Sequence, residues 1–333
     1  MDQARPTHHG ARWSGLHRRR FLQAAISTIA ASGAGARAMA AATQPRAAPE
    51  SVLVVGAGLS GLAAAYRLRD AGKRVTLIEA RPEPGGRVRT LRGYFDDGLY
   101  AELGAARVAE THEYVIHWLG ELGLSLIPFA PTGTAIQAIG GAHWRSDDLA
   151  ARERMAPGLK SDERNLSVPQ LMIKYLTGVP DELANPDIDL SDPRWREFDR
   201  VTWPAWLASR GASRAAVQLI TLGGDSSGFS ALFLLQQIML HRDSRAYLKI
   251  EGGMDRLPRA IAARLKDIIR YNCELTRLDR TGTGVRAICK TPNGMQTLAA
   301  DRAVLAIPFS TLRRVTVEPG FSAQKTKIIQ SLT

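Results

Sequence analysis

Gly56-Ala57-Gly58-Leu59-Ser60-Gly61 is the stretch that decides the fold predicted for this chain. It follows an apolar run at 52–55 and precedes a segment of helical composition that ends near Gly72. A second apolar run at 75–78 closes on Glu79, 18 residues after the last glycine of the stretch. A strand, a glycine turn, a helix, a strand and an acid in this order are typical of a βαβ unit that binds a dinucleotide. The sequence therefore predicts an α/β fold with a Rossmann-like nucleotide-binding domain.

Each residue of the motif has a predicted task. Gly56 permits the tight turn, Gly58 lets the backbone approach a pyrophosphate, and Gly61 lets the helix pack closely on the strand. The amides of Leu59 and Ser60 open the helix, whose positive end favours phosphate. The acid at the end of the second strand is expected to accept hydrogen bonds from ribose hydroxyls. The alternative is a glycine-rich turn that binds no ligand.

Composition sets limits on the class of protein. The chain has 333 residues, enough for two domains with their own cores, and its 45% apolar and 23% charged content is ordinary. The net charge is +12, but residues 1–49 carry seven Arg and one acid, which is half of that charge. Because the remainder has no dense Lys/Arg stripe, we do not expect nucleic-acid binding.

The only two cysteines, Cys273 and Cys289, are too few for a disulfide framework or a metal site. We expect them on neighbouring strands of one hairpin, as two buried thiols. A single bridge between them is the alternative.

The first forty residues, 1–40, are expected to be a signal peptide. Arg18-Arg19-Arg20-Phe21-Leu22-Gln23 resembles the twin-arginine export motif, and Ala38-Met39-Ala40 offers a cleavage site. The weakly apolar stretch at 21–36 is shorter than the roughly 20 apolar residues that span a bilayer. We therefore expect recognition by the twin-arginine export machinery, a periplasmic or secreted protein, and no stable membrane insertion. The alternative is a disordered basic tail, and 41–50 is expected to be a linker.

Changes in composition predict how the rest of the chain is divided. The predicted parts are the first part of the nucleotide-binding domain at 51–110, an inserted α+β, largely helical substrate domain at 111–245, the second part of the nucleotide-binding domain at 246–320, and the start of a further substrate-domain segment at 321–333. Apolar spacing predicts helices at 112–123, 165–178, 203–210, 213–222, 229–242 and 258–266. Trp195, Trp203 and Trp206 are expected to pack in a core. Residues 322–332 also have helical spacing but no stop signal before Thr333, so we expect more protein to follow.

A second motif at 79–90, Glu-Ala-Arg-Pro-Glu-Pro-Gly-Gly-Arg-Val-Arg-Thr, resembles the flavin-containing amine oxidase family, which includes monoamine, polyamine and L-amino-acid oxidases. Pro84 stands where the family usually has valine. The segments 101–108, 252–258, 271–278 and 303–308 also resemble family segments, so the resemblance covers about 51–333. It implies a glutathione-reductase-like, FAD/NAD(P)-binding fold whose cofactor is FAD. The FAD-binding residues it implies are Gly56, Gly58, Leu59, Ser60, Gly61, Glu79, Ala80, Arg81, Gly86, Arg87, Gly104, Ala105, Ala106, Arg107 and Leu275.

Arg107 distinguishes between members of the family. In the L-amino-acid oxidases, a Gly-x-x-Arg at this place supplies the arginine that binds the substrate carboxylate, and Gly104-Ala105-Ala106-Arg107 matches it. A planar guanidinium suits a bidentate pair with a carboxylate. The alternative is a structural ion pair with Glu102 or Glu110.

His241 matches the region of a histidine that lines the active site in several L-amino-acid oxidases. The resemblance implies that it takes a proton from the substrate ammonium, which suits an imidazole because this group titrates near neutral pH. The alternative is a surface or capping histidine at the end of a helix.

The resemblance as a whole implies oxidation of an L-amino acid by FAD and O2 to a 2-oxo acid, ammonia and H2O2. A monoamine or polyamine oxidase and an amino-acid 2-monooxygenase remain alternatives within the family. Family members run well past Thr333, and the part beyond normally completes the flavin site. If Thr333 is the natural end, we expect weak FAD binding and little turnover, and an inactive nucleotide-binding fragment is the further alternative.

Overall fold

A computed structural model describes residues 49–129, 134–139, 141–155, 157–222, 226–242 and 247–331. The predicted signal peptide at 1–40 and most of the predicted linker lie outside these residues. So do Gly140 and Ala156 of two predicted turns, and the final residue, Thr333. Across the described ranges, no helix has both the length and the apolar character needed to cross a bilayer.

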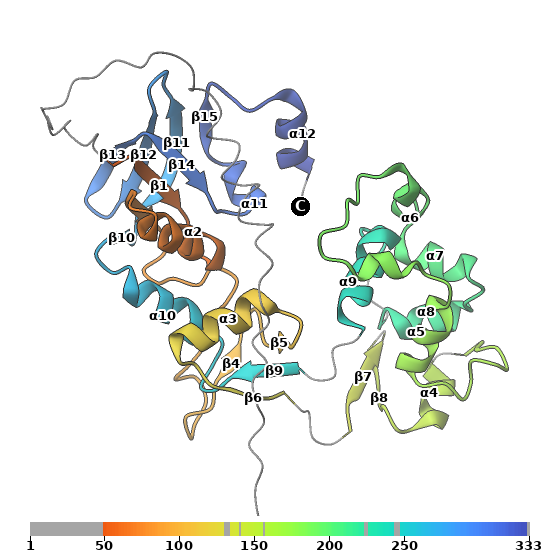
Figure 1. The fold of residues 1–333 in the computed structure, drawn as a ribbon. Coiled ribbons are helices and arrows are strands. Elements are labelled where there is room, and N and C mark those ends of the chain that lie inside the picture. Colours follow the sequence, from red (N-terminus) through yellow and green to blue (C-terminus); the bar gives the residue numbers. More distant parts are fainter. Residues whose placement is uncertain are drawn as a thin grey trace, which may run out of the picture. The chain divides into compact units, whose positions relative to one another are not determined.

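A four-stranded parallel sheet forms the centre of the nucleotide-binding part (Figure 1). Its strands stand in the order β10 (Ile269–Arg270), β2 (Arg74–Ile78), β1 (Ser51–Val55) and β14 (Arg302–Leu305). The helix α2 (Leu59–Asp70) connects β1 to β2. The order third, second, first, fourth is that of a Rossmann-like fold, so this prediction is confirmed.

Strand β1 is buried on both faces, and its side chains alternate between two cores. Val52 and Val54 pack with apolar residues of α2, of α3 (Glu113–Leu122) and of α10 (Arg256–Arg264). Leu53 and Val55 pack on the opposite face against the second sheet. The apolar run that precedes the glycine motif is therefore the central strand of three packed layers.

The second sheet has the order β13 (Gly294–Ala300), β12 (Val285–Thr291), β11 (Glu274–Arg280) and β15 (Thr316–Glu318). The predicted turn at 281–284 joins β11 to β12, and the Thr281 N–H donates to the Gly284 carbonyl at 2.8 Å. The helix α11 (Phe309–Leu312) precedes β15, and the helix α12 (Ala323–Ser331) follows it. Cys273 and Cys289 are both buried and free, which confirms the prediction of two buried thiols.

A small antiparallel sheet has the order β5 (Val108–Ala109), β9 (Tyr247–Ile250) and β6 (Leu126–Pro128). Val108 and Pro128 both pair with Leu248 of the central strand, and Ala109 pairs with Tyr247. The remaining strands form two hairpins, β3 (Thr90–Leu91) with β4 (Ala101–Glu102) and β7 (Ile136–Ile139) with β8 (Ala142–Arg145). The sheet thus brings together segments that are more than 100 residues apart in sequence.

Helices dominate the segment between β8 and β9. They are α4 (Leu149–Met155), α5 (Val168–Leu176), α6 (Arg196–Asp199), α7 (Trp203–Ser209), α8 (Arg214–Ile220) and α9 (Ala231–His241), with 3-10 turns η2 (Asp181–Ala184) and η3 (Pro193–Trp195). Serine or threonine side chains accept hydrogen bonds at the starts of α5, α7, α8 and α9. Trp195, Trp203 and Trp206 are buried in one hydrophobic cluster that also includes Trp144 of β8, which confirms that they pack in a core.

Glu163 is a fully buried carboxylate inside this helical cluster, and it predicts how stability responds to acid. Burial raises its pKa, but hydrogen bonds from Ser213, Tyr175 and the Lys160 amide outweigh burial and lower it from 4.5 to about 2. Because the folded pKa is depressed, the stabilisation is complete above pH 4.5 and is lost as the pH falls toward 2. We expect a loss of about 3 kcal/mol over this interval.

Urea unfolding followed by tryptophan fluorescence between pH 2.5 and 6 measures this loss, with Glu163→Gln as the comparison. The variant should be less stable at pH 6, and its free energy of unfolding should change less with pH than that of the wild type. Equal pH dependence in the two proteins would contradict the role of Glu163.

Candidate functional site

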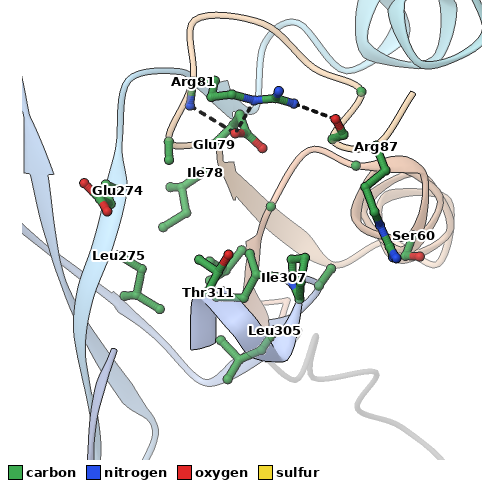
Figure 2. A pocket seen from close by; sticks show the side chains of 18 of the residues that line it. Ser60, Ile78, Glu79, Arg81, Arg87, Glu274, Leu275, Leu305, Ile307 and Thr311 are labelled. Carbon is green, nitrogen blue, oxygen red and sulfur yellow. Dashed lines mark hydrogen bonds and ion pairs between the residues drawn. The ribbon is translucent and has the colours of Figure 1, made fainter. Parts of the chain in front are cut away.

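A pocket of about 830 Å³ opens at the carboxyl ends of β1 and β2. This is the place where open α/β sheets bind their ligands. Figure 2 shows several of the side chains that line it. The lining residues are Val55, Gly56, Gly58, Leu59, Ser60, Ile78, Glu79, Ala80, Arg81, Gly85, Gly86, Arg87, Val88, Cys273, Glu274, Leu275, Leu305, Ala306, Ile307, Pro308, Thr311 and Arg314.

The structure brings ten of the predicted cofactor-binding residues together around this pocket. They are Gly56, Gly58, Leu59, Ser60, Glu79, Ala80, Arg81, Gly86, Arg87 and Leu275. Five predicted residues do not line it, namely Gly61, Gly104, Ala105, Ala106 and Arg107.

The three glycines of the first motif are constrained in different ways. Gly56 has φ +102°, and a Cβ there would lie 2.8 Å from the Ala306 carbonyl oxygen. A Cβ on Gly61 would lie 1.8 Å from the Gly56 carbonyl oxygen, so this glycine is required for packing of α2. A Cβ on Gly58 would meet no protein atom within 4 Å. Because Gly58 lines the pocket, a side chain there would occupy the space of a ligand.

Glu79 is buried at the end of β2, and the protein backbone fixes its carboxylate. Its Oε2 accepts from the Ala57 N–H at 2.7 Å, and its Oε1 accepts from the Arg81 N–H at 3.0 Å. Each oxygen keeps a further acceptor position. The arrangement therefore offers a ribose an oriented pair of acceptors, and it also ties the glycine turn to β2.

The second glycine motif lies directly on the first. The Gly85 N–H donates to the Ala57 carbonyl at 2.9 Å, and Gly85 forms an isolated bridge with Gly58. A Cβ on Gly86 would lie 3.3 Å from the Gly58 Cα. The Arg81 guanidinium donates to the Gly86 carbonyl at 3.1 Å, as Figure 2 shows. The two glycine motifs, at 56–61 and 79–90, therefore form one wall of the pocket.

Two cations of the pocket are available to bind an anion. In the part of the chain that the structure describes, no hydrogen bond or ion pair engages the side chains of Arg87 and Arg314. The start of α2 adds its own positive end, with Leu59 and Ser60 on the pocket. Positive charge of this kind fits a diphosphate.

Arg314 and Thr311 also line the pocket, although no sequence pattern predicts it. Both residues follow β14 and the segment 303–308, which resembles a family segment. They reach the pocket because α11 turns the chain back toward it. A single turn of helix gives no periodic signal. In the sequence, only Pro308 indicates that the strand ends and that the chain can reverse there.

Gly104 and Ala105 do not line the pocket, but both contact the backbone of Arg87. A Cβ on Gly104 would lie 2.0 Å from the Arg87 carbonyl oxygen, and the Ala105 N–H donates to that oxygen at 3.1 Å. These two residues therefore support the backbone that presents Arg87.

Arg107 lies immediately before β5, and its side chain is exposed. Its guanidinium carbon is 4.8 Å from the centre of the Tyr247 ring and 5.9 Å from that of Phe129. Within the described ranges it forms no ion pair with an acid, so the alternative of a structural pair has no support. Glu102, one of the two suggested partners, instead accepts from Thr90 and from the Met254 N–H.

His241 ends α9 and lies against His112, with 5.2 Å between the ring centres. The His241 Nδ1 is buried and has no hydrogen-bond partner among the described residues. The Ala109 N–H donates to His112 Nδ1 at 3.3 Å. Burial, and then the nearby His241, lower the pKa of His112. Arg107 and His112 therefore flank strand β5, and His112 brings His241 to the same strand.

Replacement of Glu79 tests its role in the pocket. Glu79→Gln keeps the shape but presents an NH2 group to one of the two backbone N–H donors. We expect about 10-fold weaker binding of a dinucleotide and a stability loss of about 1–3 kcal/mol. Fluorescence titration and urea unfolding measure these two quantities.

Glu274→Gln is the matched control, because this exposed carboxylate lines the same pocket without accepting any hydrogen bond in the described part of the chain. Equal effects of the two substitutions would contradict a specific role for Glu79.

No cluster of three or more His, Cys, Asp or Glu residues that could hold a metal ion occurs among the residues that the structure describes.

Comparison with known proteins adds independent findings. The family model for flavin containing amine oxidoreductase matches residues 59–333, and that for pyridine nucleotide-disulphide oxidoreductase matches 24–93. L-amino acid oxidase Lm29 of Lachesis muta is 31% identical over 297 residues, which are 85% of this chain and 56% of that protein.

Solved structures show the same fold. Wild-type putrescine oxidase bound to putrescine matches 85% of this chain and 63% of its own, with a TM-score of 0.67 and 25% identity. Cyclohexylamine oxidase from Brevibacterium oxydans IH-35A matches with a TM-score of 0.66, 24% identity, and coverage of 85% of this chain and 63% of its own. This chain thus spans 56–63% of the length of these relatives.

Proposed function

Because the chain belongs to the flavin-containing amine oxidoreductase family, whose cofactor is FAD, we propose that it oxidises the amine group of an L-amino acid. The products would be a 2-oxo acid, ammonia and H2O2, with O2 as the final acceptor. The similarity to an L-amino acid oxidase over 85% of this chain supports this substrate class.

The pocket fits FAD. The carboxylate of Glu79 is oriented for the adenosine ribose, and the start of α2 with Arg87 and Arg314 suits the pyrophosphate. Leu275 and Ile307 add apolar surface. The open space over Gly58 lets a ligand approach the backbone.

FAD held by these residues would supply the hydride-accepting chemistry for the carbon that carries the amine, with O2 as the final electron acceptor. The protein's own residues would orient the substrate for that transfer. Arg107 would bind the carboxylate through two parallel N–H donors. His241 would accept a proton from the substrate ammonium, because only the neutral amine can release the hydride.

The single observation that carries the choice of an amino acid is the free guanidinium of Arg107. An exposed arginine without an acidic partner in the described ranges is available to bind a carboxylate, and its guanidinium carbon lies 4.8 Å and 5.9 Å from the centres of two aromatic rings. An amine substrate has no group for it to bind.

A simple amine is the second candidate substrate, since putrescine oxidase and cyclohexylamine oxidase share this fold. An amino-acid 2-monooxygenase would use the same Arg107 but would release an amide.

We also propose export by the twin-arginine machinery, on the basis of Arg18-Arg19-Arg20-Phe21 in the sequence.

Product analysis of the full chain with FAD and O2 tests the proposal. An L-amino acid should give equal amounts of 2-oxo acid and H2O2. Release of an amide would indicate the monooxygenase. Oxidation of amines with no oxidation of any of the twenty amino acids would contradict the proposal.

A further inference from the structure

We propose that Tyr247 and Phe129 form an aromatic platform that positions the Arg107 guanidinium for the substrate carboxylate. This inference rests on the proposed function, because it explains how an exposed arginine can bind a carboxylate in a defined orientation. It assigns to both rings a positioning role that their sequence pattern does not reveal.

The platform is built by the register of the small sheet. Ala109 pairs with Tyr247, and the Phe129 N–H donates to the Tyr247 carbonyl at 2.8 Å. Residues that pair across strands share one face of a sheet, as do residues two apart on one strand. Arg107, Ala109, Tyr247 and Phe129 therefore lie on the same face. Ala109 is small, so the arginine can reach past it to the Tyr247 ring of β9 and to the Phe129 ring just after β6.

The contact distances agree with this register. The guanidinium carbon of Arg107 is 4.8 Å from the Tyr247 ring centre and 5.9 Å from the Phe129 ring centre, both within the range of a cation–π interaction. Both rings are half-buried, whereas Arg107 is exposed. The rings are thus held by the sheet, and the arginine lies on their solvent side.

Aromatic rings hold an arginine differently from an acid. An acid would occupy the N–H donors and neutralise the charge that a substrate carboxylate needs. A ring attracts the cation through its face and leaves the N–H donors in the plane of the guanidinium free. The platform therefore restricts the motion of the side chain without competing for its ligand, and less conformational entropy is lost when a carboxylate binds.

Binding of benzoate and benzylamine to the full chain loaded with FAD tests the platform by isothermal titration. Tyr247→Leu should weaken benzoate binding about 10-fold and Phe129→Leu about 3-fold, as expected for loss of a cation–π contact. Tyr247→Phe should retain wild-type affinity because it keeps the ring. Benzylamine affinity should not change in any variant.

Phe321→Leu is the matched control, since it removes a different ring that lies 4.4 Å from a cation, the Lys325 ammonium. It should leave benzoate affinity unchanged. A second readout follows the Arg107 Nε–H resonance, identified by its loss in Arg107→Ala. The Tyr247→Leu substitution should move this resonance because the ring current is removed, whether or not a ligand binds.

The outcomes separate the two levels of the proposal. If Arg107→Ala weakens benzoate binding but Tyr247→Leu and Phe129→Leu do not, the platform is overturned and the proposed function stands. If Arg107→Ala has no effect on benzoate, the carboxylate role of Arg107 fails. In that case an unchanged Nε–H resonance in Tyr247→Leu would overturn the platform as well.

Discussion

Gly58→Val should abolish FAD binding while the protein remains folded. Gly58 has φ −71° and ψ 173°, an extended conformation that valine adopts without strain. A Cβ at this position would meet no protein atom within 4 Å, and the side chain would enter the pocket next to the start of α2. We expect FAD affinity to fall at least about 100-fold. The pyrophosphate of the ligand must approach the protein backbone at Gly58, and this leaves no room for a side chain.

Gly61→Val is the matched comparison, since it adds the same side chain three residues later. A Cβ at this position would lie 1.8 Å from the Gly56 carbonyl oxygen, so the helix must move away from β1. We expect a stability loss of about 3 kcal/mol. Urea unfolding and FAD titration of both variants distinguish the two effects. Tight FAD binding by Gly58→Val would contradict the assignment of the pocket.

Arg107→Ala should remove the preference for amino acids. A bidentate, charge-assisted pair between a guanidinium and a carboxylate contributes about 3 kcal/mol, so KM for an amino acid should rise about 100-fold. An amine that lacks the carboxylate should be oxidised as before. Steady-state O2 consumption measures both.

Arg107→Lys separates charge from shape. A lysine keeps the positive charge but cannot form the bidentate pair, so we expect an intermediate KM. A wild-type KM in Arg107→Lys would mean that charge alone binds the carboxylate. No change in Arg107→Ala would remove Arg107 from the substrate site.

The two central strands of the parallel sheet, β1 and β2, could be predicted because their signals are local. The apolar run before Gly56, the glycine spacing and Glu79 all lie within one βαβ unit, and the structure forms it as expected. The predicted helices between 165 and 242 were found for a similar reason, because each has regular apolar spacing and a polar residue at its start.

The rest depends on contacts between distant segments, which no local pattern encodes. Tyr247 and Phe129 meet Arg107 only because β9 lies between β5 and β6, and two of these strands have three residues or fewer. Arg314 reaches the pocket through one turn of helix. The close approach of Gly104 to the Arg87 carbonyl oxygen is likewise not visible in the sequence.

The most direct test compares an amino acid with the amine that lacks only its carboxylate, because Arg107 is proposed to bind that carboxylate. The full chain with FAD should be assayed for H2O2 with leucine and isopentylamine, and with phenylalanine and phenethylamine, beside Arg107→Ala. We predict that kcat/KM favours the amino acid of each pair by about 100-fold in the wild type, and that Arg107→Ala brings the ratio close to one. If this ratio of kcat/KM values is the same in the wild type and in Arg107→Ala, or if the wild type prefers the amines, the proposed role of Arg107 is contradicted.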